Sequence, residues 1–86
     1  MYTRQTVVRC DSGLHNEQVT YFVQKANEYR SSIWLEVGSR RMNAKSLLGM
    51  MSLGVVTGTG VTLYADGPDA AEAIDTLEAL LQQDIY

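Results

Sequence analysis

The sequence contains one cysteine, one proline and one histidine among its 86 residues. Because Cys10 is alone, an intramolecular disulfide and a zinc site with four cysteine ligands are both excluded. No window approaches the roughly 18 apolar residues of a membrane-spanning helix, and the first residues lack the apolar core of a signal peptide. We therefore expect a cytoplasmic protein without membrane insertion. The length leaves room for one hydrophobic core, which predicts a single domain over residues 1–86.

Basic residues are absent from the last part of the chain. Residues 1–60 hold seven basic and four acidic residues, a net charge of +3, whereas residues 61–86 hold six acidic and no basic residues. The overall charge of −3 argues against nucleic acid as a direct partner, because phosphate binding needs clustered Lys and Arg. The chain also lacks a nucleotide-binding glycine loop and a cluster of metal ligands, and it is too short for a closed pocket. We expect no cofactor, no metal and no stand-alone enzyme.

Apolar periodicity predicts four strands and three helices. Alternating apolar residues or β-branched composition indicate strands at 2–9, 33–37, 40–43 and 61–65. The i, i+3, i+4 spacing and capping signals indicate helices at 16–28, at 47–53 with a stop at Gly54, and from a capping box of Asp69 and Glu72 to near residue 83. The order β-α-β-β-α-β-α predicts an α+β fold in which three helices cover one face of a four-stranded antiparallel sheet. Trp34, Thr62 and Tyr64 then point to the open face, where we expect them to shield the sheet locally rather than to bind a ligand.

The predicted helix 47–53 is too short to bury all of its apolar residues. Ser46 is a good N-cap, because its hydroxyl can accept a hydrogen bond from an amide of the first turn. A helix of two turns cannot bury Leu47, Leu48, Met50 and Met51 together, so some of them must face solvent. We expect Met50 to pack inward, and Leu47, Leu48 and Met51 to form an exposed apolar surface beside the serine.

Three segments carry a resemblance to a known family. These are Ser12-Gly13-Leu14-His15, the run from Asn43 through Ala44-Lys45-Ser46 to Leu53, and Gly58 to Gly67. Together they resemble HPr, the histidine-containing phosphocarrier protein of the bacterial sugar phosphotransferase system, over nearly the whole chain. The resemblance implies an open-faced β-sandwich. It also implies a histidine that takes phosphate from enzyme I and passes it to sugar-specific enzyme II components.

His15 falls where the family carries its phosphohistidine, just before a predicted helix. A neutral imidazole with a pKa near ~6.5 is a nucleophile at neutral pH, and unpaired amides at a helix start favour an anionic phosphoryl group. The backbone amides of Asn16, Glu17 and Gln18 would receive the phosphoryl oxygens. The alternative is that His15 is only a polar residue at the helix entry.

The residues after His15 depart from the family pattern. HPr proteins usually continue His-Ala-Arg-Pro, whereas this chain continues Asn16-Glu17-Gln18. Glu17 therefore replaces an arginine that helps to hold the phosphoryl group in the family. Two like charges ~5 Å apart repel by about 3 kcal/mol at an effective dielectric constant of ~20, and by severalfold less when exposed to solvent. Phosphate transfer through His15 is thus expected to be weakened, unless Glu17 turns away.

Ser46 retains the surroundings that the family has. The resemblance implies that an ATP-dependent HPr-type kinase/phosphorylase phosphorylates it, and that Leu47, Leu48 and Met51 dock the partner proteins. Lys45 adds a positive charge next to it in the sequence. The alternative readings are a plain helix cap and apolar residues that only pack.

Two functions follow from the resemblance. The first is a phosphocarrier, a phosphoryl-transfer intermediate that relays phosphate through His15 and is regulated at Ser46. The second is a non-carrier regulatory HPr paralogue, which acts through phosphorylated Ser46 and binds a transcription regulator in catabolite repression. The retained His15 favours the first and Glu17 favours the second. The family arginine also helps to grip the regulator, so its replacement by Glu17 weakens both.

Overall fold

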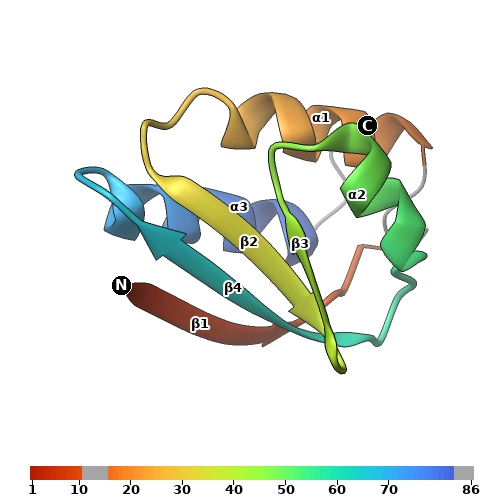
Figure 1. Ribbon diagram of the computed structural model, residues 1–86. Helices are drawn as coiled ribbons and strands as arrows, with labels where there is room; N and C mark the ends of the chain where they lie inside the picture. The colour runs from red at the N-terminus through yellow and green to blue at the C-terminus, as the bar shows by residue number, and fades with distance from the viewer. Residues whose placement is uncertain (11–15, 83–86) are drawn as a thin grey trace.

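The computed structural model describes residues 1–10 and 16–82, which form four strands and three helices. In chain order they are β1 (Tyr2–Val7), α1 (Asn16–Ala26), β2 (Ser32–Val37), β3 (Arg40–Asn43), α2 (Leu47–Leu53), β4 (Gly60–Asp66) and α3 (Ala70–Gln82). Figure 1 shows the strands as one twisted sheet, with the helices gathered on one side of it. The predicted open-faced sandwich is confirmed, in the predicted order of elements.

The sheet has the strand order β1-β4-β2-β3, and every neighbouring pair is antiparallel. On β4, Leu63 lies between Leu35 of β2 and Arg4 of β1. Leu63 and Leu35 are fully buried, whereas the next pair in the register, Trp34 and Tyr64, is half-buried. The period of two in the sequence therefore separates a helix-covered face from an open face, as predicted.

The open face is shielded by contacts among its own side chains. The Tyr64 hydroxyl donates a hydrogen bond to Glu36 Oε1 at 2.8 Å, and the Arg41 guanidinium lies 4.0 Å from the centre of the Tyr64 ring. Arg41 also pairs with Glu36 at 3.7 Å. These contacts cover the aromatic ring with side chains of β2 and β3, as expected for local shielding.

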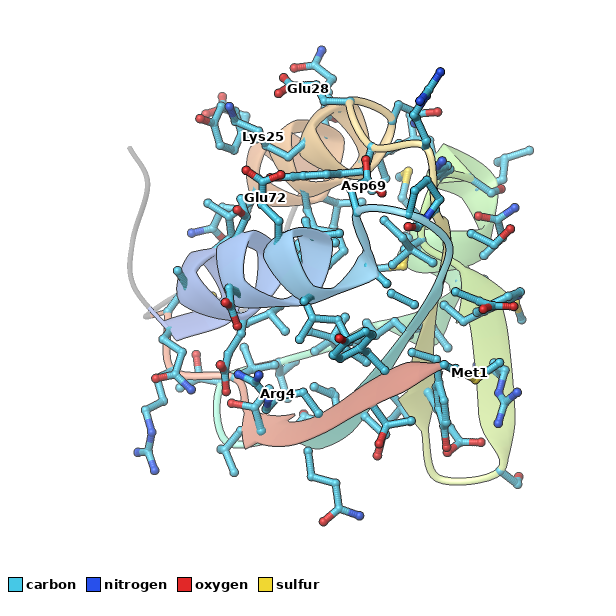
Figure 2. The ribbon with its side chains drawn as sticks, turned by 90° about the vertical axis from the view of Figure 1, so that its left-hand side faces the viewer. Met1, Arg4, Lys25, Glu28, Asp69 and Glu72 are labelled. Atoms are coloured by element: carbon cyan, nitrogen blue, oxygen red, sulfur yellow. The ribbon has the colours of Figure 1, made fainter. Side chains whose placement is uncertain are left out.

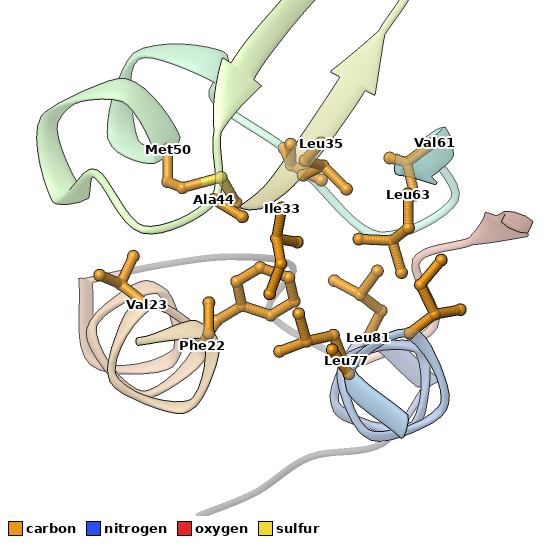
Figure 3. Packing of buried hydrophobic residues seen from close by; sticks show 14 of the residues in the cluster. Phe22, Val23, Ile33, Leu35, Ala44, Met50, Val61, Leu63, Leu77 and Leu81 are labelled. Carbon is orange, nitrogen blue, oxygen red and sulfur yellow. The ribbon is translucent and has the colours of Figure 1, made fainter. Parts of the chain in front are cut away.

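The hydrophobic core lies between the helices and the covered face of the sheet. Phe22 of α1 is fully buried and reaches toward Ile33 of β2, while Leu77 and Leu81 of α3 approach from the other side (Figure 3). Met50 of α2 is buried in the same cluster. Burying each large apolar side chain contributes about 1.5–3 kcal/mol, so this layer supplies most of the folding free energy. Within the described residues, none of the helices has the length and apolar character that crossing a membrane requires.

Two elements end earlier than the sequence predicted. β1 stops at Val7 instead of Arg9, because the backbone N–H groups of Arg9 and Cys10 turn to Leu81 O at the end of α3, at 2.8 and 3.3 Å. α1 stops at Ala26 instead of Glu28, where the backbone tightens to i→i−3 hydrogen bonds. The predicted end of the last helix, near residue 83, lies outside the described residues.

The start of α3 is fastened to the segment before β2. The Asp69 carboxylate accepts hydrogen bonds from Arg30 N at 2.9 Å, Ser31 N at 3.0 Å and Ser31 Oγ at 2.6 Å. The Ser31 hydroxyl, followed by the Arg30 amide, lowers the pKa of Asp69 to about 2. The sequence predicted a capping box between Asp69 and Glu72, but the Asp69 carboxylate makes these bonds to residues 38 and 39 positions away.

α3 is also held to β1 by ion pairs along its length. Arg4 pairs with Glu78 at 2.6 Å and with Asp75 at 3.2 Å. Figure 2 shows Arg4 on the first strand beneath α3, with Asp69 at the start of that helix. Arg4 of the first strand therefore neutralises part of the negative charge in the acidic C-terminal part of the sequence.

Candidate functional site

Helix α2 has a defined beginning and end. Ser46 has an extended backbone, with φ −102° and ψ 115°, and its hydroxyl oxygen accepts a hydrogen bond from Gly49 N at 3.1 Å. At the other end Gly54 is left-handed and donates its N–H to Met51 O at 3.3 Å. The predicted cap and stop are both confirmed.

The apolar residues of α2 divide between the core and the solvent. Met50 and Leu53 are buried, whereas Leu47 is 40%, Met51 47% and Leu48 83% exposed. We call Leu47, Leu48 and Met51 the α2 patch. The predicted inward position of Met50 and the predicted exposure of the other three are confirmed. An 83% exposed leucine contributes little to folding, so its presence is not explained by packing within this chain.

The segment that leads into α2 is fixed by the residues of the Asn-x-Lys-Ser sequence. Asn43 Oδ1 accepts a hydrogen bond from Lys45 N at 2.8 Å, a turn that asparagine side chains commonly form. Lys45 Nζ donates to Tyr29 O at 2.7 Å, and Asn27 Nδ2 donates to Lys45 O at 3.2 Å. The Lys45 ammonium therefore ties this segment to the loop after α1. Its charge, which the sequence placed beside Ser46, is engaged with that carbonyl.

A second tie joins the β2–β3 hairpin to the far end of α2. Arg40 donates to Ser52 O at 3.0 Å and to Ser52 Oγ at 3.3 Å, and Ser52 Oγ donates to Gly49 O at 2.6 Å. The sequence does not indicate this contact, because no local pattern relates residue 40 to residue 52. Hydrogen bonds therefore hold α2 at both ends, and they fix the position of the α2 patch relative to the sheet.

The other predicted site lies at the start of α1. His15 and the side chain of Asn16 lie outside the described residues, while the backbone of Asn16 opens the helix. Glu17 is exposed in the first turn, and Gln18 is buried at 5% exposure. The backbone amides proposed to receive phosphate thus belong to the first turn of α1.

α1 and α2 are in contact, and the first residues of α1 lie at the α2 side of the molecule (Figure 1). The chain that leads toward residue 11 is held from both sides, because Thr57 of the α2–β4 loop bonds to Cys10 O and Arg9 N bonds to Leu81 O. The fold therefore brings the start of α1 and the α2 patch to one region. Val56, on the same loop as Thr57, is 57% exposed and was not singled out from the sequence.

Comparisons with known proteins agree with this architecture. The family model described as the PTS HPr component phosphorylation site matches residues 2–83. The chain is 42% identical to the HPr-like protein Crh of Bacillus subtilis strain 168, over 99% of this chain and 100% of Crh. It is 37% identical to the phosphocarrier protein HPr of Vibrio cholerae, over 96% of this chain and 98% of that protein. The crystal structure of HPr-C-His from Thermoanaerobacter tengcongensis superimposes with a TM-score of 0.91 at 40% identity, over 95% of this chain and 92% of that chain.

The open-faced sandwich of this chain is the fold of the solved HPr structures. The chain belongs to the HPr family. Its relatives include both an HPr-like protein and a phosphocarrier, so membership of the family does not by itself choose between the two functions.

Proposed function

We propose that this protein is a regulatory HPr-family protein that is phosphorylated on Ser46 and binds its partners through the α2 patch. The observation that carries the proposal is the geometry of α2: a capping serine whose hydroxyl lies next to three exposed apolar side chains. The similarity to Crh, which is described as a catabolite repression HPr of Bacillus subtilis, supports the regulatory assignment. A catabolite-control transcription regulator is then the partner of the phosphorylated form.

Phosphorylation would change the charge next to the patch without requiring a new fold. Ser46 Oγ would attack the γ-phosphorus of ATP, ADP would leave, and the hydroxyl proton would pass to a base of an HPr-type kinase/phosphorylase. The product carries a charge of about −1.5 to −2 and three acceptor oxygens beside an apolar surface. That combination suits a partner with an apolar groove and a nearby arginine, because an arginine fork pairs well with phosphate.

The first experiment incubates the protein with an HPr-type kinase and ATP and locates the phosphate by mass spectrometry. We expect one phosphate on Ser46 and none on Ser46→Ala. A wild-type protein that gains no phosphate, or a Ser46→Ala protein that gains the same one, would end this proposal.

The second experiment measures the contribution of the patch to partner binding. Leu48→Ala should weaken binding of the phosphorylated protein to the regulator at least tenfold, while its unfolding free energy stays within about 0.5 kcal/mol because Leu48 is 83% exposed. Tyr2→Ala is a matched control: Tyr2 is 55% exposed and lies on β1, away from α2 (Figure 1). Equal affinities of the Leu48→Ala and wild-type proteins would exclude the patch from the interface.

A second candidate function is phosphate relay in the phosphotransferase system, and retention of His15 favours it. Enzyme I would load His15 from phosphoenolpyruvate, and sugar-specific enzyme II components would unload it. Glu17 lies in the first turn of α1, next to the amides that would receive the phosphate, and this position supports the expectation of a weakened carrier. Its exposure to solvent screens the repulsion, so we expect a reduced rate of transfer rather than none.

Replacing Glu17 by arginine tests this second function. Glu17→Arg exchanges a repelling charge for an attracting one, so transfer from enzyme I should rise about five- to thirtyfold and the gain should shrink at high salt. His15→Ala must abolish transfer in both backgrounds. Wild-type transfer at the level of an ordinary carrier, unchanged in Glu17→Arg, would show that Glu17 does not hinder the phosphate.

A further inference from the structure

Gly49 lies on the first turn of α2 and faces the side chain of Ser46. Its N–H donates the cap hydrogen bond to Ser46 Oγ. A Cβ placed on Gly49 would stand 3.3 Å from Ser46 Oγ, 3.4 Å from Ser46 Cβ and 3.6 Å from Met42 Cβ. The missing side chain therefore leaves open one side of the serine hydroxyl, in a space that Met42 bounds from the strand.

We infer that Gly49 is a specificity-determining residue for phosphorylation of Ser46, because it keeps free the space that the incoming phosphoryl group occupies. This inference rests on the proposed function. In the transfer the Oγ–phosphorus bond forms and the bond from the γ-phosphorus to its bridging oxygen breaks. ADP leaves with that oxygen, and the serine proton passes to the kinase's base. Three further oxygens then surround Oγ, where an unmodified serine carries only a proton.

Rotation of the serine does not provide an easy way around a side chain at position 49. Ser46 Oγ stays on the side of Gly49 because it accepts a hydrogen bond from the Gly49 backbone N–H, with an N–O distance of 3.1 Å. Turning Oγ away would break that bond and leave an amide of the first turn unpaired. With a methyl group at position 49, Ser46 could therefore either keep its capping hydrogen bond or accept the phosphoryl group, but not both.

The unmodified protein should tolerate the same methyl group. A carbon–oxygen separation of 3.3 Å is tight and needs a shift of a few tenths of an ångström, whereas a separation under 3.0 Å would not be accommodated so easily. Gly49 lies inside a helix and has no positive φ, and alanine is the better helix former. Folding and phosphorylation therefore respond differently to Gly49→Ala.

The test compares the wild-type, Gly49→Ala and Gly60→Ala proteins as substrates of an HPr-type kinase with ATP. Gly60 is the matched control, because a Cβ there would meet nothing within 4 Å and Gly60 has no positive φ. We expect kcat for Gly49→Ala to fall at least tenfold while its KM changes less than twofold. Gly60→Ala should match the wild type. The melting temperature of Gly49→Ala should equal or exceed that of the wild type.

Any other outcome contradicts either the proposed function or the inference about Gly49. If the wild type accepts no phosphate, the proposed function fails and this inference fails with it. If the wild type is phosphorylated and Gly49→Ala reacts at the same rate, only the inference is overturned. A raised KM with unchanged kcat would make Gly49 a docking residue instead. A Gly49→Ala protein that does not fold would contradict the contact distances on which the inference stands.

Discussion

Replacing Gly67 with alanine should be far more damaging than an ordinary glycine substitution. Gly67 has φ +151°, which side chains disfavour, and a Cβ there would lie 2.6 Å from both Cα and Oγ of Ser31. Ser31 is 1% exposed and is held by Asp69, so it has no room to retreat. Backbone strain of about 1–3 kcal/mol and overpacking of about 1–3 kcal/mol give an expected loss of roughly 2–6 kcal/mol.

Gly38→Ala separates the two contributions. Gly38 also has a positive φ, +59°, but a Cβ there would meet nothing within 4 Å, so only the strain of about 1–3 kcal/mol applies. Urea unfolding followed by circular dichroism measures both variants. With a slope of about 2 kcal/mol per M, Gly67→Ala should lower the midpoint by roughly 1–3 M, and by more than Gly38→Ala does. A Gly67→Ala protein as stable as Gly38→Ala would refute the claim that Ser31 blocks this position.

Two further predictions concern Asp69 and Trp34. The folded-state pKa of Asp69, about 2, lies below its ordinary value of 3.8, so its carboxylate stabilises the fold above pH ~4 and loses this effect as the pH falls toward 2. Asp69→Asn should therefore lose less stability than the wild type between these pH values in urea titrations, and parallel curves would contradict this. Trp34 is half-buried on the open face, so an aqueous quencher should reduce its fluorescence, and an unquenched, blue-shifted emission would show that this face is covered.

Local pattern in the sequence was sufficient for the order of the elements and for the faces of the sheet. Strands such as 61–65 alternate apolar and polar residues because one face packs against helices, and this periodicity can be read without knowing the partner. The same holds for α2. A helix of seven residues with five large apolar side chains must expose some of them, and a serine before its first turn acts as a cap wherever the helix lies. The resemblance to HPr depended on these same segments.

The contacts between distant segments were decided by the tertiary structure. Asp69 was predicted to cap its own helix, but the fold brings Arg30 and Ser31 against it, and three donors bind the carboxylate there. Lys45 was expected to place its charge beside Ser46, but its ammonium reaches the Tyr29 carbonyl. Hydrogen-bonding groups pair with whatever the packed chain places within about 3 Å, and sequence periodicity carries no information about that neighbour. For this reason the sequence predicted the α2 patch and its serine, while the contacts that hold them in place became visible only in the folded chain.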